Sequence, residues 1–178
     1  MALPAFEDVK RIAILGTGTI GASWTAYFLA HGYDVTAWDP ADGWRDRLQA
    51  FVDNARPQLQ ALGADPAAEG KLAFAETPEA AVTGAQFIQE NATERMPIKR
   101  ELFSRIDPHV GPDTVMALST SGLILSDMQD GLAMAPRMVV GHPFNPPHLI
   151  PLVEVVLGKA TAPETGTWAH GFYGHIGK

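Results

Sequence analysis

The chain has 178 residues, 46% of them hydrophobic and 19% charged, and its 13 basic and 20 acidic side chains give a net charge of −7. Such an acidic surface disfavours nucleic acids and anionic membranes as partners, and the lack of cysteine excludes disulfides and thiolate metal sites. The apolar segment after the polar residues 1–10 is too short for a signal peptide or a membrane span, so we expect a soluble, cytoplasmic protein. We also expect no metal ion.

Short β-rich segments alternate with longer helical segments from residue 11 onward, which predicts an α/β fold with a parallel sheet. The expected strands are 11–15, 34–39, 72–75, 86–90, 115–118, 138–141 and 152–156. The expected helices are 20–31, 44–62, 97–106 and 163–176.

Two of these helices have further expected features. Pro57 should kink or split the second helix near Arg56. In the third helix we expect Lys99, Arg100 and Arg105 to face solvent. Since no linker is found before Leu157, residues 1–178 are predicted to form one domain.

The first predicted strand runs into a glycine-rich loop, after which a helix begins. Gly16 permits a tight turn, Gly18 lets a pyrophosphate approach the backbone, and Gly21 allows the helix to pack closely on the strand. Free N–H groups at the helix N-terminus attract phosphates. This pattern predicts a Rossmann-type, doubly wound and mainly parallel sheet that binds a dinucleotide. The expected loop contacts are Gly16, Gly18, Thr19, Ile20 and Gly21.

Asp39 ends the second predicted strand, 18 residues after Gly21. An acid there accepts hydrogen bonds from ribose hydroxyls and repels the 2′-phosphate of NADP, and no arginine lies in the next five residues to offset that repulsion. The predicted cofactor is therefore NAD. FAD, which uses the same kind of loop, and a structural turn followed by a chance acid are the alternatives.

His142 follows the predicted strand 138–141, and Glu154 lies in the next one. Open α/β sheets bind their ligands just past the C-terminal ends of parallel strands. Histidine side chains titrate near neutrality and can accept a hydroxyl proton while hydride leaves the same carbon, and a carboxylate such as Glu154 would hold the imidazole in one tautomer. On spacing alone, a surface or core histidine without a catalytic role is the other interpretation.

His142 with Asn145-Pro146, and Glu154 twelve residues after the histidine, resembles the signature of the L-3-hydroxyacyl-CoA dehydrogenase family. The glycine loop, Thr120-Ser121 and the segment 90–103 resemble the same family in the same order. The resemblance implies an NAD-binding N-terminal domain and oxidation of a 3-hydroxy to a 3-keto group. It also implies a helical C-terminal domain, absent from this chain, that supplies an asparagine and makes a homodimer, so we expect the chain to be truncated.

The resemblance also implies roles for the site residues. His142 is the catalytic base, Glu154 is its charge partner, and Ser121 hydrogen-bonds the substrate oxygen near the nicotinamide. The implied further cofactor contacts are Glu94, Lys99, Ser121 and Asn145. Without the resemblance, these could be a helix-start acid, a solvated lysine, a turn residue and an amide that satisfies a loop backbone.

The substrate has two interpretations, a 3-hydroxyacyl-CoA or a small free hydroxy acid. CoA-using members of the family have a lysine-rich helical hairpin after the second strand, whereas residues 41–70 here contain three arginines, five acids and no lysine. The segments 119–123 and 142–147 resemble the branch that oxidises small free acids such as L-carnitine and L-gulonate, which we favour.

Two other functions remain open. One is a protein that binds NAD without turnover, in a crystallin-like or regulatory role, because fold alone does not imply activity. The other is a sugar-nucleotide or 6-phosphogluconate type of dehydrogenase. Those enzymes commonly use a lysine base, and no lysine lies between Arg100 and Leu157.

Overall fold

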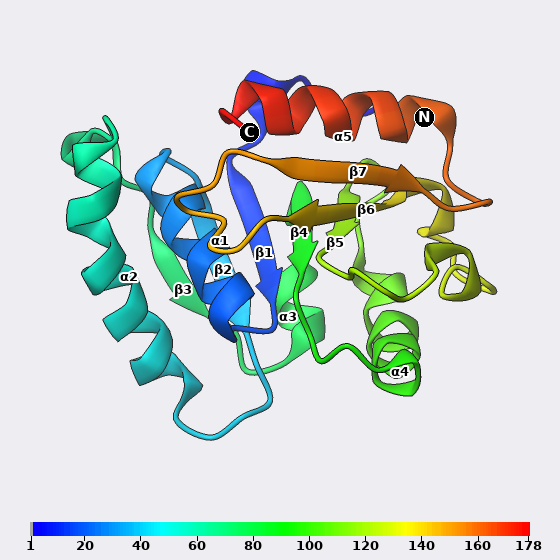
Figure 1. Cartoon of the computed structure of the whole chain (residues 1–178). Helices are drawn as coiled ribbons and strands as arrows, with labels where there is room; N and C mark the ends of the chain where they lie inside the picture. Colours follow the sequence, from blue (N-terminus) through cyan, green and yellow to red (C-terminus); the bar gives the residue numbers. More distant parts are fainter. Residues whose placement is uncertain (1) are drawn as a thin grey trace.

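A computed structural model describes residues 2–178, so that Met1, the first residue of the predicted domain, lies outside the described residues. Within them, seven strands form one sheet in the order β3-β2-β1-β4-β5-β6-β7 (Figure 1). The strands are β1 (Arg11–Leu15), β2 (Asp34–Trp38), β3 (Leu72–Phe74), β4 (Phe87–Glu90), β5 (Val115–Leu118), β6 (Met138–Pro143) and β7 (Val153–Leu157).

All neighbouring strands are parallel except β6 and β7, which are antiparallel. The strand order reverses between β1 and β4. In an open sheet, such a reversal opens a crevice at the carboxyl ends of the strands. The predicted doubly wound, mainly parallel sheet is therefore confirmed.

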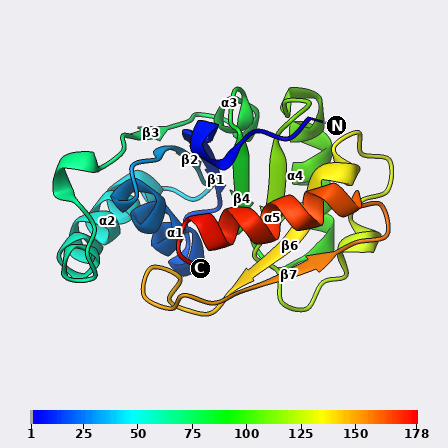
Figure 2. The same cartoon turned by 90° about the horizontal axis from the view of Figure 1, so that it is seen from above.

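Helices cover both faces of the sheet. They are α1 (Thr19–Ala30), α2 (Trp44–Ala61), α3 (Pro78–Val82), α4 (Met96–Ile106) and α5 (Pro163–His175). One apolar core joins the sheet to α1, α2 and α5, and a second joins it to α3 and α4. Helix α5 packs against β6 and β7 (Figure 2). Ile12 and Ile14 face the first core and Ala13 and Leu15 the second, which explains why β1 is apolar throughout.

Pro57 does not split the second helix, because α2 is one helix from Trp44 to Ala61. Its apolar face is buried on both sides of the proline, since Val52 and Ala55 before it and Leu59 after it are all buried. This packing outweighs the lost hydrogen bond and ring clash of an internal proline, which cost about 3 kcal/mol.

Lys99 does not face solvent as predicted, since 1% of it is exposed, whereas Arg100 and Arg105 are exposed. Strand β6 is two residues longer than predicted, because β7 pairs with its end. The short helix α3 was not predicted. Among residues 2–178, no helix is both long and apolar enough to cross a bilayer, and no three His, Asp or Glu side chains are grouped as metal ligands would be.

Candidate active site

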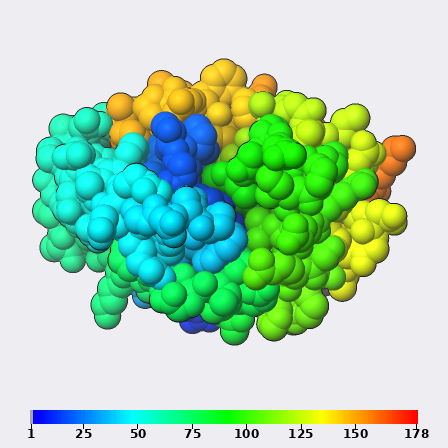
Figure 3. All heavy atoms as spheres, turned by 90° about the horizontal axis from the view of Figure 1, so that it is seen from below, coloured from blue at the N-terminus to red at the C-terminus, as the bar shows by residue number. Residues whose placement is uncertain are grey.

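A hollow of about 450 Å³ lies at the carboxyl ends of β1, β2 and β4. Seen from that side, the glycine loop lies at its base, between the segment that follows β2 and the segment that leads into α4 (Figure 3). Its lining includes Gly16, Gly18, Asp39, Asn91 and Ala92. This is the crevice expected from the strand order, so the fold and the hollow indicate one binding site.

Each glycine of the loop has a different steric surrounding. A Cβ on Gly16 would lie 2.7 Å from the backbone of Asn91, and its φ of +84° suits glycine. A Cβ on Gly21 would lie 1.9 Å from the carbonyl oxygen of Gly16. Around Gly18, in contrast, no atom lies within 4 Å of a Cβ. Gly16 and Gly21 therefore permit close packing, while Gly18 leaves open space in the hollow.

That open space lies at the start of α1, where Thr19 and Ile20 are the first helical residues. The N–H groups of a first helical turn have no partner within the helix and attract phosphate. A pyrophosphate would meet the bare backbone of Gly18 and these N–H groups together. The loop therefore fits a dinucleotide.

The Asp39 carboxylate lies at the rim of the same hollow. It accepts hydrogen bonds from the backbone N–H of Thr17 at 2.6 Å, from the Thr17 hydroxyl at 3.2 Å and from the N–H of Ala41 at 2.9 Å. None of the ion pairs within residues 2–178 includes it. Asp39 therefore joins the glycine loop to the end of β2 and places its carboxylate beside the site.

His142 and Glu154 are direct cross-strand partners in the antiparallel pair β6–β7. The Nδ1 atom of His142 lies 2.9 Å from Oε2 of Glu154. Since a carboxylate accepts, Nδ1 donates and Nε2 of the neutral ring is left as the basic nitrogen. The histidine lies within β6 rather than past its end, but beyond Val140, the last residue paired with the parallel strand β5.

Ser121 and Asn145 follow the C-terminal ends of β5 and β6, at the same edge of the sheet as His142. Ser121 lies three residues after Leu118, where β5 ends, and Asn145 two residues after Pro143, where β6 ends. Both are exposed. Because β5 and β6 are neighbours, a substrate held between these segments would lie beside His142. The two residues are therefore accessible, as substrate or cofactor contacts must be.

The Ser121 loop is held by Glu94, whose carboxylate accepts hydrogen bonds from the N–H groups of Ser121 (3.1 Å) and Gly122 (3.2 Å) and from the hydroxyl of Thr120. Burial alone would raise the pKa of Glu94, but these hydrogen bonds and the nearby Lys99 ammonium outweigh it, and the pKa is lowered. Glu94 is thus an anionic anchor for the loop.

Lys99 lies beneath this anchor. Its Nζ donates to both carboxylate oxygens of Glu90 and to the carbonyl of Ala92, and it lies 3.7 Å from Oε2 of Glu94. Lys99 is therefore positioned to act on the site through Glu94. Sequence reasoning missed Glu90 and Thr120 as members of this network, although both lie in the segments that resemble the family.

Residues 11–178 match the family described as 3-hydroxyacyl-CoA dehydrogenase, NAD binding domain. The chain belongs to this family. The predicted resemblance and the predicted cofactor, NAD, are thereby confirmed. This result settles the choice against FAD and against the 6-phosphogluconate type of dehydrogenase.

The chain is 52% identical over 173 residues to an L-carnitine dehydrogenase of Streptomyces griseus, covering 97% of this chain and 52% of the relative. It is 46% identical over 176 residues to an L-carnitine dehydrogenase of a Pseudomonas species, covering 98% and 55%. It thus spans about half the length of the curated relatives it matches.

The solved structures that share the fold include the following two. A 5-formyl-3-hydroxy-2-methylpyridine 4-carboxylic acid 5-dehydrogenase, described as an NAD⁺-dependent dismutase, superposes with a TM-score of 0.87 at 35% identity, covering 95% of this chain and 55% of that one. The 3-hydroxybutyryl-CoA dehydrogenase of Escherichia coli gives a TM-score of 0.84 at 26% identity, covering 96% and 37%.

A second polar network of this NAD-binding domain was not predicted from the sequence. The Tyr173 hydroxyl donates to Gln89 at 2.6 Å, Gln89 donates to Ser119 at 2.9 Å, and Ser119 donates to Asn91 at 2.7 Å. It connects α5 with the base of the cofactor hollow, where Asn91 lies against Gly16. Its members lie in or directly after β4, directly after β5 and in α5, so no sequence spacing indicates it.

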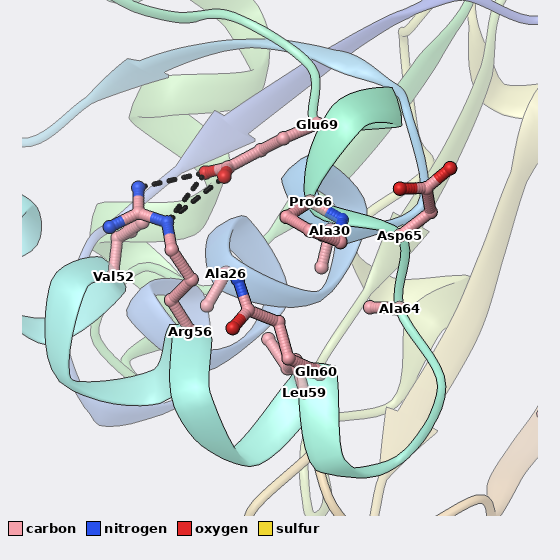
Figure 4. Close-up of a pocket in the computed structure, with 10 residues that line it drawn as sticks. All are labelled: Ala26, Ala30, Val52, Arg56, Leu59, Gln60, Ala64, Asp65, Pro66 and Glu69. Carbon is pink, nitrogen blue, oxygen red and sulfur yellow. Dashed lines mark hydrogen bonds and ion pairs between the residues drawn. The ribbon is translucent and has the colours of Figure 1, made fainter.

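A smaller hollow lies between α1, α2 and the segment 64–69 (Figure 4). Its volume is about 10 Å³, which is room for one water molecule. Arg56 and Glu69 form an ion pair at 2.8 Å across it. It is lined by neither the glycine loop nor His142, so it is not the active site.

Proposed function

We propose that this chain is the NAD-binding half of an enzyme that oxidises the 3-hydroxy group of a small free hydroxy acid, such as L-carnitine, to a ketone. The observation behind this proposal is the His142–Glu154 pair at the same sheet edge as the glycine loop. A protein that only stores or senses NAD needs no base at that edge, whereas a hydroxyl must lose its proton as it becomes a carbonyl.

In the proposed reaction, Nε2 of His142 accepts the substrate hydroxyl proton. Glu154 holds the ring through Nδ1 and stabilises the imidazolium that forms. Ser121 donates a hydrogen bond to the substrate oxygen and fixes its direction toward His142. When bound, NAD supplies the acceptor for the hydride that leaves the same carbon. The residues Glu94, Lys99 and Asn145 are proposed to support or contact the cofactor at its nicotinamide end.

The free acid is favoured over a CoA ester because the arginines of α2 have partners already. Arg45 pairs with Glu76 at 2.8 Å, and Arg56 pairs with Asp53 and Glu69, each at 2.8 Å. Arg47 donates to a backbone carbonyl at 2.8 Å. A phosphate clamp needs basic groups with free donors. The names of the curated relatives support the same substrate class.

The test uses the full-length protein, assayed by NADH formation with L-carnitine, L-gulonate, other small 3-hydroxy acids and 3-hydroxybutyryl-CoA. We expect the highest kcat/KM with a free acid, and an activity about 10²–10⁴-fold lower in a His142→Gln variant. A much higher kcat/KM with the CoA ester would contradict the proposed substrate. Tight NAD binding without turnover of any substrate would favour the binding-protein alternative.

The proposed homodimer and cytoplasmic location can be checked on the same protein by sedimentation and by cell fractionation.

A further inference from the structure

The segment 144–152 connects β6 to β7 and includes Asn145, and the side chain of His148 joins it to two helices of the domain. His148 is 7% exposed and lies between α1 and α2. Its Nδ1 lies 2.7 Å from the hydroxyl oxygen of Ser23 and its Nε2 lies 3.2 Å from Oε1 of Gln58. The ring also packs edge-on against Phe51, with the centroids 5.6 Å apart. A loop residue thus joins two helices.

The partners of His148 define its protonation. The amide oxygen of Gln58 only accepts, so Nε2 donates to it. The hydroxyl of Ser23 accepts from the backbone N–H of His148 at 2.9 Å and donates to Nδ1. Both ring nitrogens are satisfied by the neutral imidazole in a single tautomer. Protonation of Nδ1 would reverse its hydrogen bond with Ser23, because Nδ1 would then donate to the hydroxyl oxygen.

The surroundings of His148 also favour the neutral ring. Burial lowers the pKa of His148, and the charge of Lys178 lowers it further. Lys178 donates to the carbonyl oxygen of Pro147 in the same segment. The other titratable groups that line the adjoining hollow are Tyr27, in α1, His31, directly after α1, and Asp65, after α2.

Ser23 places this contact about one helical turn from the cofactor site. It is four residues into α1, the helix whose first turn faces the hollow at Gly18, and it is fully buried. Asn145 lies three residues before His148 on the other side of the contact. The Ser23–His148 bond therefore connects the phosphate-binding helix to the segment proposed to contact the nicotinamide.

We propose that His148 is a positioning residue that holds segment 144–152 against α1, so that Asn145 meets the nicotinamide end of NAD bound along the same helix. This inference rests on the proposed cofactor contacts of Asn145. It differs from the roles proposed above, because His148 touches neither substrate nor cofactor. Its effect should be confined to the nicotinamide half of the ligand, since the adenosine side is bound by Asp39 and the glycine loop.

The test compares NAD with ADP-ribose, which lacks the nicotinamide. Calorimetry should compare the 178-residue chain with its His148→Ala variant. We expect the affinity for NAD to fall about five- to tenfold, which is the size expected for the loss of about one hydrogen bond. The affinity for ADP-ribose should change less than about twofold. Hydrogen exchange at the N–H groups of Leu149 and Ile150, which both donate to Pro146, should become faster. His148→Asn, whose Oδ1 replaces Nδ1 as the acceptor from Ser23, should recover part of the NAD affinity.

His170→Ala is the matched control, because His170 is exposed on α5 and its replacement should alter neither affinity. If His148→Ala does not fold, Ser23→Ala removes the same bond from the helix side and should give a smaller loss in the same direction. An equal loss for NAD and ADP-ribose, or unchanged exchange at Leu149 and Ile150, would overturn the inference. A wild-type chain that binds neither ligand would contradict the proposed function instead, and the exchange measurement would then decide the inference alone.

Discussion

The Nζ atom of Lys99 lies 2.6 Å and 2.7 Å from the two carboxylate oxygens of Glu90, and both side chains are almost completely buried. The pair joins α4 to the end of β4 directly below Glu94, which holds the Ser121 loop. Taking two charges out of water is costly, and a buried pair is stable only while both members are present. Removing either member of the pair should therefore destabilise the part of the domain that holds the Ser121 loop.

Replacing Lys99 with methionine should lower the free energy of unfolding by about 3–5 kcal/mol, because it leaves Glu90 buried without a cation. Urea denaturation followed by circular dichroism measures this loss. Lys71→Met, at an exposed lysine, is the control and should change the free energy of unfolding by less than about 0.5 kcal/mol. An equally small effect at Lys99 would show that the pair is not important for stability.

The cost of Lys99→Met should depend on pH. Burial raises the pKa of Glu90, and Lys99 opposes that rise. Without the lysine, the folded variant binds a proton at Glu90 more tightly than the unfolded chain does, so its stability falls as pH rises above the ordinary glutamate value. The loss relative to wild type should be smaller at about pH 5 than at about pH 8. The double variant Glu90→Gln/Lys99→Met should lose this pH dependence.

Local chemistry explains which parts of the site could be predicted from sequence. The glycine loop and Asp39 lie within one β-α-β unit, where each residue's task depends on its near neighbours. The twelve-residue spacing of His142 and Glu154 suits the antiparallel register that places them opposite each other. The placement of these residues could be predicted without knowledge of the rest of the sheet.

Burial depends on tertiary packing and could not be predicted in the same way. We expected Lys99 to face solvent, because lysine side chains are buried only where they pair with a specific acceptor. That acceptor, Glu90, belongs to a strand, so the pattern of α4 alone does not indicate it. Helix α3 spans five residues, too few for an apolar period, although Thr77 caps it by accepting from the N–H of Ala80. A threonine followed by Pro78 was the one signal that could have identified it.

Gly18→Val should abolish NAD binding and leave the fold intact. The new side chain would point into open space in the hollow, where it would exclude the pyrophosphate without contacting the domain. Gly21→Ala is the contrasting variant, because its Cβ would lie 1.9 Å from the carbonyl oxygen of Gly16, and it should lower the melting temperature. Calorimetry with NAD and thermal denaturation separate the two effects. Normal NAD titration by Gly18→Val would mean that the loop does not bind the cofactor.

The wild-type chain should bind NAD at least about fivefold more tightly than NADP. The reason is that the Asp39 carboxylate and the 2′-phosphate of NADP repel each other, by about 1 kcal/mol for two unit charges about 4 Å apart even in water. Asp39→Ala should narrow that preference. It should also weaken NAD binding, since Thr17 and Ala41 lose their acceptor. Asp42→Ala changes the net charge equally at an exposed neighbouring position and should leave the preference unchanged. Equal wild-type affinities for the two cofactors would refute the role of Asp39.

In the full-length enzyme, His142→Gln should lower kcat by about 10²–10⁴-fold, the usual value of general-base assistance. Its effect on NAD affinity should be small, because the cofactor hollow is formed by other residues. Glu154→Gln should cost less, no more than about tenfold, since exposed ion pairs are worth about 1 kcal/mol or less and the Glu154 side chain is 58% exposed. The double variant should be no slower than His142→Gln, because Glu154 acts only through the imidazole. Steady-state kinetics of the three variants, with the exposed His109→Gln as control, test this order. A His142→Gln enzyme with the wild-type kcat, or a Glu154 effect that persists without the histidine, would contradict the mechanism.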